Sequence, residues 1–337
     1  MKYLAKITIQ KELKIFLLLS ILSLLLFSLQ SCSENDEPAT CETDASLCIF
    51  DFDYQTFHSM AEVAITTTKY YDDNSKDLEV KIFEAESNND NFRPLLLLSP
   101  GGAWTRYTRL DDINAIALNL AKRGYVVGVV EYTINEGGSS WNPYIMVQSI
   151  LDIKAAVKFF KKNAVSYRID TEKIFSGGWS SGGQASLYSA HLSEEDFEVA
   201  VIDFKNVVEA PFAAYGFEPN IYEEYSSDVK GTILLMPWSA DPGLFDLEGP
   251  SVMMIAHPNS HFAGGERIWG EFLLGGSLLY GPDKMREHAL SAGYIEGENL
   301  QLHVMDDYDM HDSHVNYSPL MDQHYDRITD FIFNNLN

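Results

Sequence analysis

The fold is decided by the stretch Gly178-Trp179-Ser180-Ser181-Gly182-Gly183. It fits the pattern Gly-x-Ser-x-Gly and joins a short apolar run at 173–176 to a small-residue run at 184–188 that suits a helix. In a strand, sharp turn and helix of this kind, the glycines leave room for a strained backbone that pushes one serine hydroxyl clear of the chain. Ser180 is therefore the candidate nucleophile. Ser181 does not fit, because Trp179 stands two positions before it.

A second glycine-rich turn lies upstream, at Pro100-Gly101-Gly102-Ala103-Trp104. It follows residues 93–99, whose continuous apolar core is typical of a strand buried on both faces. A helix is predicted after the turn, ended by Gly124. Its apolar stripe has the i, i+3, i+4 spacing and consists of Ile113, Ile116, Ala117, Leu120 and Ala121.

Strands and helices alternate along the rest of the chain, which implies a mostly parallel central sheet with helices on both faces in one α/β domain. Ser180 then lies at the carboxyl end of a central strand, the edge where open α/β sheets bind ligands. Residues 204–229 are aromatic and irregular, and predict either a wall over the site or a surface excursion. Further strands are expected at 61–68, 78–83, 125–130, 231–238, 252–256 and 300–305, and further helices at 146–160, 284–292 and 320–333.

The order of these features resembles the α/β-hydrolase superfamily, in particular its exported esterases of the acetyl-xylan-esterase, feruloyl-esterase and hormone-sensitive-lipase-like groups. The resemblance runs from about residue 60 to the end of the chain and is most specific between the two glycine-rich turns. It implies an α/β-hydrolase fold and acyl transfer, in which Ser180 attacks a carbonyl carbon and backbone N–H groups hold the charge on its oxygen. By resemblance, those donors belong to Gly102, Ala103 and Ser181, and no cofactor or metal is implied.

The general base is expected late in the chain, because hydrolases of this type run serine, acid, histidine in sequence order. His311 and His314 both follow the last expected strand. His311 is preferred because it lies nearer the strand, as the base of these esterases does. Four aspartates share the segment 306–314 with the two histidines, but their spacing matches no metal motif, so we interpret it as a solvated acidic loop.

The acid is where the sequence departs from the pattern. These esterases carry it a few residues after the second-last strand, and this chain has His261 at that position. Three alternatives stay open: Asp241 after the preceding strand, Glu266 further along the loop, or no acid, with Asn259 holding the imidazole through a neutral hydrogen bond. We rank Asp241 first, although an ordinary Asp-Pro-Gly turn would also place an aspartate there.

The amino terminus predicts export. Four lysines precede the apolar run 15–29, which is typical of a secretory signal, and Leu29-Gln30-Ser31-Cys32 resembles a bacterial lipobox in which Cys32 becomes the lipidated first residue. An uncleaved anchor is the alternative. The expected organisation is a signal peptide at 1–31, an acidic tether at 32–47 and an α/β-hydrolase domain at 48–337, in a protein lipid-anchored to the bacterial outer membrane at the cell surface or in the periplasm.

Composition and cysteine content fit an exported globular protein. The chain has 337 residues, 46% of them hydrophobic, which is enough for one large core. Its 24 Lys and Arg against 49 Asp and Glu give a formal charge of −25, which argues against a nucleic-acid partner because such a surface repels phosphate. Cys41 and Cys48 are placed to form a local disulfide in an oxidising compartment, with two free thiols as the alternative.

Together these features predict a serine esterase that hydrolyses small acyl esters of carbohydrates through Ser180, His311 and Asp241. Two alternatives stay open. One is a binding lipoprotein of the same fold whose catalytic site is impaired. The presence of His261 at the position expected for the acid favours this alternative. The other is a serine peptidase, which normally has an extra domain that this chain has little room for. The sequence does not specify the oligomeric state.

Overall fold

The computed structural model describes residues 54, 57–58, 61–71, 75–86, 91–138, 142–199, 202–241, 244–245, 249–257, 269–274, 277–305 and 318–336. These residues belong to one compact unit, Ile49–Asn337. Cys32, Cys41 and Cys48 lie outside the described residues, and so do the predicted signal peptide and tether.

An eight-stranded sheet with the order β1-β2-β4-β3-β5-β6-β7-β10 forms the centre of this unit. β2 pairs antiparallel with β1 and β4, and each of the other pairs is parallel. The predicted α/β fold with a mostly parallel sheet is therefore confirmed. The strands are β1 (Val63–Lys69), β2 (Glu79–Ala85), β3 (Arg93–Ser99), β4 (Val126–Val130), β5 (Ile169–Trp179), β6 (Gly231–Leu235), β7 (Ser251–Ala256) and β10 (Leu300–Val304).

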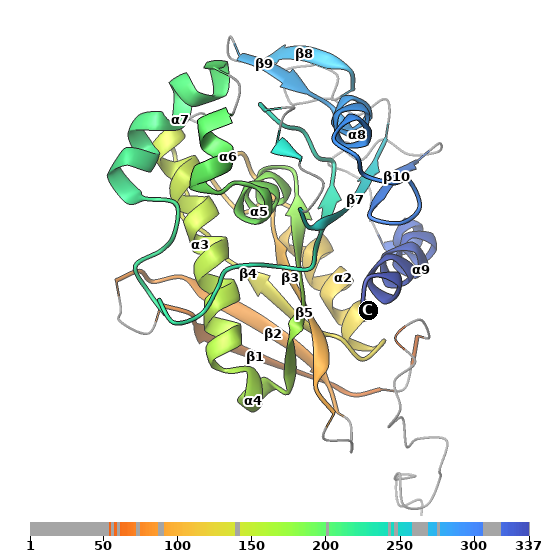
Figure 1. Ribbon diagram of the computed structural model, residues 1–337. Helices are drawn as coiled ribbons and strands as arrows, with labels where there is room; N and C mark the ends of the chain where they lie inside the picture. Colours follow the sequence, from red (N-terminus) through yellow and green to blue (C-terminus); the bar gives the residue numbers. More distant parts are fainter. Residues whose placement is uncertain are drawn as a thin grey trace, which may run out of the picture. The chain divides into compact units, whose positions relative to one another are not determined.

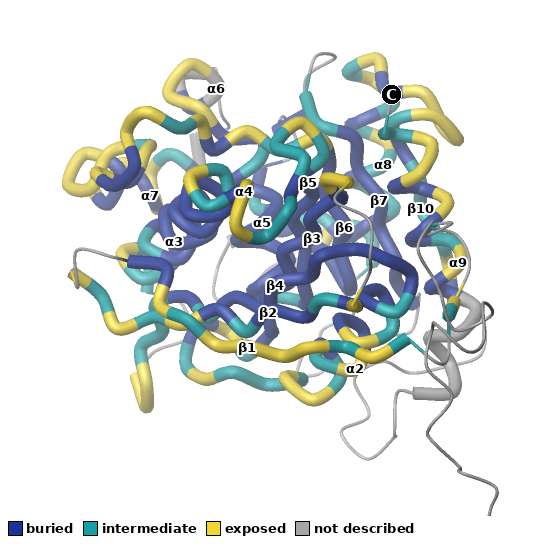
Figure 2. The backbone as a smooth tube through the Cα atoms, turned by 90° about the horizontal axis from the view of Figure 1, so that it is seen from below, coloured by how far each residue is buried: buried dark blue, intermediate teal, exposed yellow. Residues whose placement is uncertain are grey.

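Helices cover both faces of the sheet (Figures 1 and 2). α2 (Leu110–Ala121) and α9 (Ser318–Asn334) pack together on one face. α3 (Pro143–Lys162) and α5 (Ser181–His191) pack together on the other, with the short α4 (Ala164–Tyr167) leading into β5. α8 (Pro282–Ser291) precedes and contacts β10.

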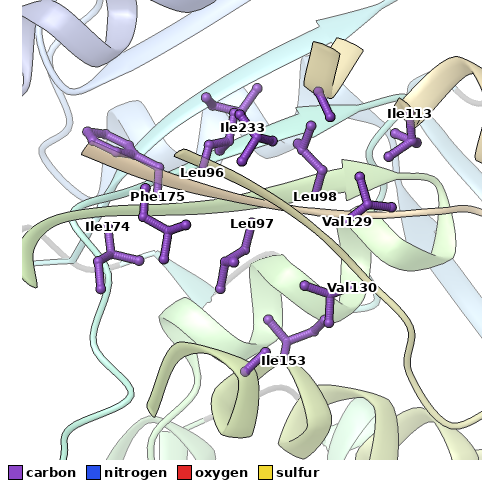
Figure 3. Close-up of a cluster of buried hydrophobic side chains, with 14 of the residues drawn as sticks. Leu96, Leu97, Leu98, Ile113, Val129, Val130, Ile153, Ile174, Phe175 and Ile233 are labelled. Atoms are coloured by element: carbon purple, nitrogen blue, oxygen red, sulfur yellow. The ribbon is translucent and has the colours of Figure 1, made fainter. Parts of the chain in front are cut away.

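The core has two layers because the central strands are apolar on both faces. Every residue of β3 and β4 is buried, and Figure 2 shows them in dark blue between the helices. In Figure 3, Leu96 and Leu98 lie on one face with Ile113 of α2, and Leu97 lies on the other face with Ile153 of α3. The predicted stripe of α2 is buried at all five positions, so the helical period read from the sequence is confirmed.

The prediction of an irregular segment at 204–229 is wrong in its first half. Residues up to Tyr215 form α7 (Ile202–Tyr215), which follows the short α6 (Glu194–Val199). Phe204, Val208 and Phe212 recur every four residues and are all buried, a helical signal that the aromatic content obscured.

The second half of this segment is a surface loop, which is one of the two alternatives that the sequence analysis left open. After Tyr215 the chain runs down along α3 and returns to the start of β6 (Figure 1). Lys154 of α3 fixes this path, because its ammonium group donates to the Phe217 carbonyl oxygen at 2.9 Å and to a Glu218 carboxylate oxygen at 2.9 Å.

The sequence patterns missed a hairpin near the carboxyl edge of the sheet. It consists of β8 (Glu271–Leu274) and β9 (Ser277–Tyr280), two strands of only four residues each. Tyr280 exchanges backbone hydrogen bonds of 2.8 and 2.9 Å with Ser239, so the hairpin contacts the segment that follows β6. In the described part of the chain, no helix is long and apolar enough to span a bilayer.

Candidate active site

The candidate site lies where the parallel strands end. β3 pairs with β5 through Ser99 and Gly178, and β5 pairs with β6 through Trp179 and Leu235. β6, β7 and β10 continue in parallel register. Since the carboxyl ends of these strands meet at one edge, the glycine loop after β3, Ser180 after β5 and Asp241 after β6 all start from that edge.

Ser180 occupies a strained turn. Its backbone has φ 48 and ψ −117, between the last residue of β5 and the first residue of α5. A non-glycine residue in such a region costs about 1–3 kcal/mol and persists only where its surroundings hold it. Two hydrogen bonds do so here: the Ser180 N–H donates to the Leu235 carbonyl oxygen at 3.0 Å, and the Ser180 carbonyl oxygen accepts the Gln184 N–H at 2.8 Å. Ser180 is half-buried, whereas its neighbours Trp179 and Ser181 are buried.

The glycines around Ser180 are required by close backbone contacts. A Cβ at Gly178 would lie 2.3 Å from the Ser99 carbonyl oxygen, and one at Gly182 would lie 2.4 Å from the Pro100 carbonyl oxygen. A Cβ at Gly183 would lie 2.6 Å from the Gly178 carbonyl oxygen. The pattern Gly-x-Ser-x-Gly-Gly therefore lets the turn pack directly against the end of β3.

The glycine loop (residues 101–108) forms a tight turn beside Ser180. Its ends are joined by a hydrogen bond from the Thr108 N–H to the Gly101 carbonyl oxygen at 2.7 Å. Gly102 has φ 137, and a Cβ there would lie 1.8 Å from the Arg106 carbonyl oxygen. Ala103 and Trp104 both adopt left-handed backbones, with φ 53 and 59. As at Ser180, this strain needs support from neighbouring groups.

Trp104 anchors the loop on its inner side. Its indole N–H donates to the Ser149 hydroxyl oxygen of α3 at 3.0 Å, and its ring packs edge-on against Trp238 at 6.0 Å between centroids. Only 2% of Trp104 is exposed, so it is a packing residue and leaves little surface for a sugar.

Three hydrogen bonds connect the turn at Ser180 to the glycine loop and, through Tyr132, to Pro100 just before it; we call them the Ser181 network. The Ala103 N–H donates to the Ser181 hydroxyl oxygen at 2.9 Å. That oxygen lies 3.1 Å from the Tyr132 hydroxyl, which donates to the Pro100 carbonyl oxygen at 2.8 Å. Pro100 and Ala103 are thus held by Ser181 through two separate routes.

The predicted oxyanion donors lie together at this junction. The Ser181 N–H belongs to the first residue of α5 and precedes the first helical hydrogen bond, which Gln184 donates. Helix N-termini of this kind favour negative charge. Gly102 and Ala103 lie in the adjacent loop, where the Ala103 N–H is directed at the Ser181 hydroxyl oxygen. The roles of the three donors stay predictions.

Asp241 is buried, with 1% of its surface exposed. Its turn is fixed by Ser239, whose hydroxyl donates to the Asp241 carbonyl oxygen at 2.7 Å and accepts the Asp241 N–H at 3.1 Å. Tyr188 of α5 accepts the Ala240 N–H at 2.9 Å and lies 3.2 Å from the Ser239 hydroxyl oxygen. Burial raises the pKa of Tyr188 to about 12, so it keeps its proton. The helix that begins beside Ser180 therefore also positions the turn that carries Asp241.

Several predicted site residues lie outside the described residues: His311, His314, Asn259, His261 and Glu266. The strands before them, β7 and β10, end at the same edge as β5. His257, directly after β7, is buried. Within the described ranges, no group of three His, Cys, Asp or Glu side chains could hold a metal ion.

Sequence reasoning missed the side chains of Tyr132 and Tyr188. Tyr132 lies two residues beyond β4, a strand that is parallel to β3 and ends at the same edge. Its place after a buried strand was a signal that could have drawn attention to it. Tyr188 lies eight residues beyond Ser180 on an expected helix, which gave no comparable signal.

A mostly parallel sheet, a glycine loop after β3 and a strained serine turn after β5 are features of the α/β-hydrolase fold, and the chain has this fold. A family model described as BD-FAE, an α/β-hydrolase-like esterase family, matches residues 80–215. The matched segment includes both the glycine loop and Ser180. No curated protein sequence matches the chain.

Solved structures with a similar fold include esterase 2 of the planctomycete Thermogutta terrifontis. Its apo form shares 15% identity and a TM-score of 0.55, covering 82% of this chain and 95% of that chain. The form phosphonylated by cyclosarin shares 14% identity and a TM-score of 0.55, covering 81% and 93%. The propionate-bound form shares 14% identity and a TM-score of 0.55, covering 82% and 94%. At this identity, the likeness establishes the fold.

Proposed function

We propose that this protein is a serine esterase that hydrolyses carboxylic esters with small acyl groups. The observation that carries the proposal is the backbone of Ser180, held at φ 48 between β5 and α5 and packed against the glycine loop. A strained turn of this kind is expected at a nucleophile, because strain persists where function requires one geometry.

The comparisons support this chemistry. The BD-FAE match covers the segment that contains the glycine loop and Ser180. Thermogutta esterase 2 has been solved with propionate bound, with butyrate bound and after phosphonylation by sarin. Those ligands belong to that enzyme. We extend to this chain only the preference for a small acyl group.

The proposed reaction has two steps. The Ser180 hydroxyl oxygen attacks the ester carbonyl carbon while His311 takes the hydroxyl proton, and His311 then gives that proton to the departing alcohol. Water then attacks the acyl-serine while His311 takes a proton from it, and His311 returns that proton to the Ser180 oxygen as the acid leaves. Backbone N–H groups at the junction of the glycine loop and α5 stabilise the oxyanion in both steps. Asp241 orients His311 and stabilises its charged form.

The proposed alcohol is a hydroxyl group of a carbohydrate, and the proposed location is the outer membrane, through lipid on Cys32. Both proposals rest on the sequence: the lipobox-like Leu29–Cys32 and the resemblance to exported carbohydrate esterases. Replacing Cys32 with serine in the producing bacterium tests the anchor. We expect the wild-type protein to begin at a lipidated Cys32 and the variant to lack the lipid, and a wild-type protein that keeps residues 1–31 would support an uncleaved anchor instead.

Turnover of p-nitrophenyl acetate and butyrate tests the reaction. We expect the wild-type protein to release p-nitrophenol and Ser180→Ala to lose this activity while keeping its melting temperature. Ser189→Ala, on the same helix but near its other end, serves as the matched control. A stable wild-type protein without turnover would support the binding lipoprotein, and Ser180-dependent cleavage of peptides but not esters would support the peptidase.

A further inference from the structure

We propose that the side chain of Ser181 is a positioning residue which, together with Tyr132, holds the glycine loop in its reactive conformation. This inference rests on the proposed esterase function. It assigns Ser181 a role beyond its backbone N–H and leaves Gly102 and Ser181, without Ala103, as the oxyanion donors.

The directions of the hydrogen bonds in the Ser181 network are fixed by chemistry. The Pro100 carbonyl oxygen can only accept, so the single proton of the Tyr132 hydroxyl is donated to it, at 2.8 Å. The contact of 3.1 Å between the two hydroxyls is then donated by Ser181 to Tyr132. The Ser181 oxygen is left to accept the Ala103 N–H at 2.9 Å. Each hydroxyl thus donates once and accepts once, an arrangement in which the bonds strengthen one another.

The network keeps its protons over the pH range of ester hydrolysis. Burial raises the pKa of the Tyr132 hydroxyl well above its ordinary value, more than the Ser181 contact lowers it. The network therefore acts as a constant support and not as a pH switch.

The peptide group between Gly102 and Ala103 is held at both ends. Its carbonyl oxygen accepts the Thr105 N–H at 3.1 Å and the Thr105 hydroxyl at 3.2 Å. Its N–H donates to Ser181. This peptide group precedes two left-handed residues, Ala103 and Trp104, and its fixed plane sets the direction of the neighbouring Gly102 backbone.

The Ala103 N–H is engaged by the Ser181 hydroxyl and therefore does not point at a substrate oxygen. The remaining donors of the predicted set are the N–H groups of Gly102 and Ser181, which lie on the two segments that the network joins. Without the network, the distance between these two segments would no longer be fixed, and the two N–H groups would not be held in position for the same oxygen. Because charge on the substrate oxygen develops only in the transition state, we expect the loss in kcat and not in KM.

The experiment compares the wild-type protein with Ser181→Ala, Tyr132→Phe and the double variant on p-nitrophenyl acetate. We expect kcat to fall about tenfold in each single variant, with KM within about twofold of wild type, since removing a direct oxyanion donor costs about 100-fold or more. The double variant should lose little beyond Ser181→Ala, because both changes break the same network.

Ser189→Ala is the control for the loss of one buried serine hydroxyl from α5. Its hydroxyl donates to the Ser186 carbonyl oxygen at 2.8 Å, away from the glycine loop, and we expect wild-type kcat. If Ser181→Ala does not fold, Tyr132→Phe, which removes the other hydroxyl of the network, decides the result. Wild-type kcat in Ser181→Ala and Tyr132→Phe would overturn this inference alone. A wild-type protein without Ser180-dependent turnover would overturn the esterase function, and this inference with it.

Discussion

The Ser180 N–H donates a hydrogen bond to the Leu235 carbonyl oxygen, with 3.0 Å between nitrogen and oxygen. This bond ties the candidate nucleophile to the end of β6, and the chain reaches the buried Asp241 six residues later. Tyr188 of α5 holds the turn that carries Asp241, because its hydroxyl accepts the Ala240 N–H and contacts the Ser239 hydroxyl. The nucleophile and the first-ranked acid are therefore fixed to one framework.

We expect Asp241→Asn to lower kcat about 10⁴-fold, because an amide cannot stabilise the charged form of the base. Glu266→Gln is the matched control and should keep wild-type activity. Steady-state hydrolysis of p-nitrophenyl acetate measures both. An active Asp241→Asn with an inactive Glu266→Gln would assign the acid to Glu266. Full activity in both variants would show that neither carboxylate is the acid.

His311→Ala should lose at least as much activity as Asp241→Asn, since the base moves a proton in each step. His314→Ala should retain activity, because His314 lies further from the last strand. The same assay distinguishes the two histidines. If His314→Ala is inactive and His311→Ala is active, the general base is His314 and not His311.

Gly182→Ala should be destabilising, although alanine normally stabilises a helix by about 0.5–1 kcal/mol relative to glycine. The new Cβ would lie 2.4 Å from the carbonyl oxygens of Ser99 and Pro100. We expect the free energy of unfolding to fall by about 1–3 kcal/mol, with a loss of esterase activity.

Gly137→Ala is the control for this change. Among the described residues other than its chain neighbours, no heavy atom lies within 4 Å of a Cβ at that position, and its φ of +69 is what opposes alanine. We expect it to keep activity. Denaturant unfolding measures both variants, and a Gly182→Ala protein at least as stable as wild type would contradict the close packing of the turn against β3.

His303 predicts a pH dependence of stability. Burial, followed by the nearby charges of Arg327 and His324, lowers the pKa of His303 to about 4. In the unfolded chain the pKa is about 6.5, so between these values the unfolded state binds more protons than the folded state. The free energy of unfolding should therefore fall as pH falls from about 6.5 to about 4.

His303→Asn should make this decline shallower, which unfolding experiments at several pH values would measure. NMR titration of the His303 ring tests the cause directly. A midpoint near pH 4 agrees with the partial burial of His303 beside Arg327 and His324, and a midpoint near 6.5 would contradict it.

The fold was predictable because its signals are local. The apolar run of β3 and the stripe of α2 follow from strand and helix periods, and both are buried as the sequence predicts. The glycine pattern around Ser180 is also local, since it reflects steric limits within a few residues. The β8–β9 hairpin was missed because strands of four residues are too short to establish an alternating pattern.

The side-chain contacts of the site could not be predicted in the same way. Tyr132 and Ser181 are 49 positions apart, and their contact depends on how the chain between β4 and β5 places two turns at one edge. No periodicity in the sequence encodes that distance. The same holds for Tyr188 and Ser239, which are 51 positions apart.

Labelling with a fluorophosphonate probe tests the central claim, that Ser180 is an activated nucleophile, most directly. Such a probe reacts with activated serine hydroxyls and does not depend on knowing the natural ester. We predict stoichiometric labelling of the wild-type protein, located by peptide mass spectrometry at Ser180, and no labelling of Ser180→Ala. An unlabelled wild-type protein, or equal labelling of Ser180→Ala, would contradict the account.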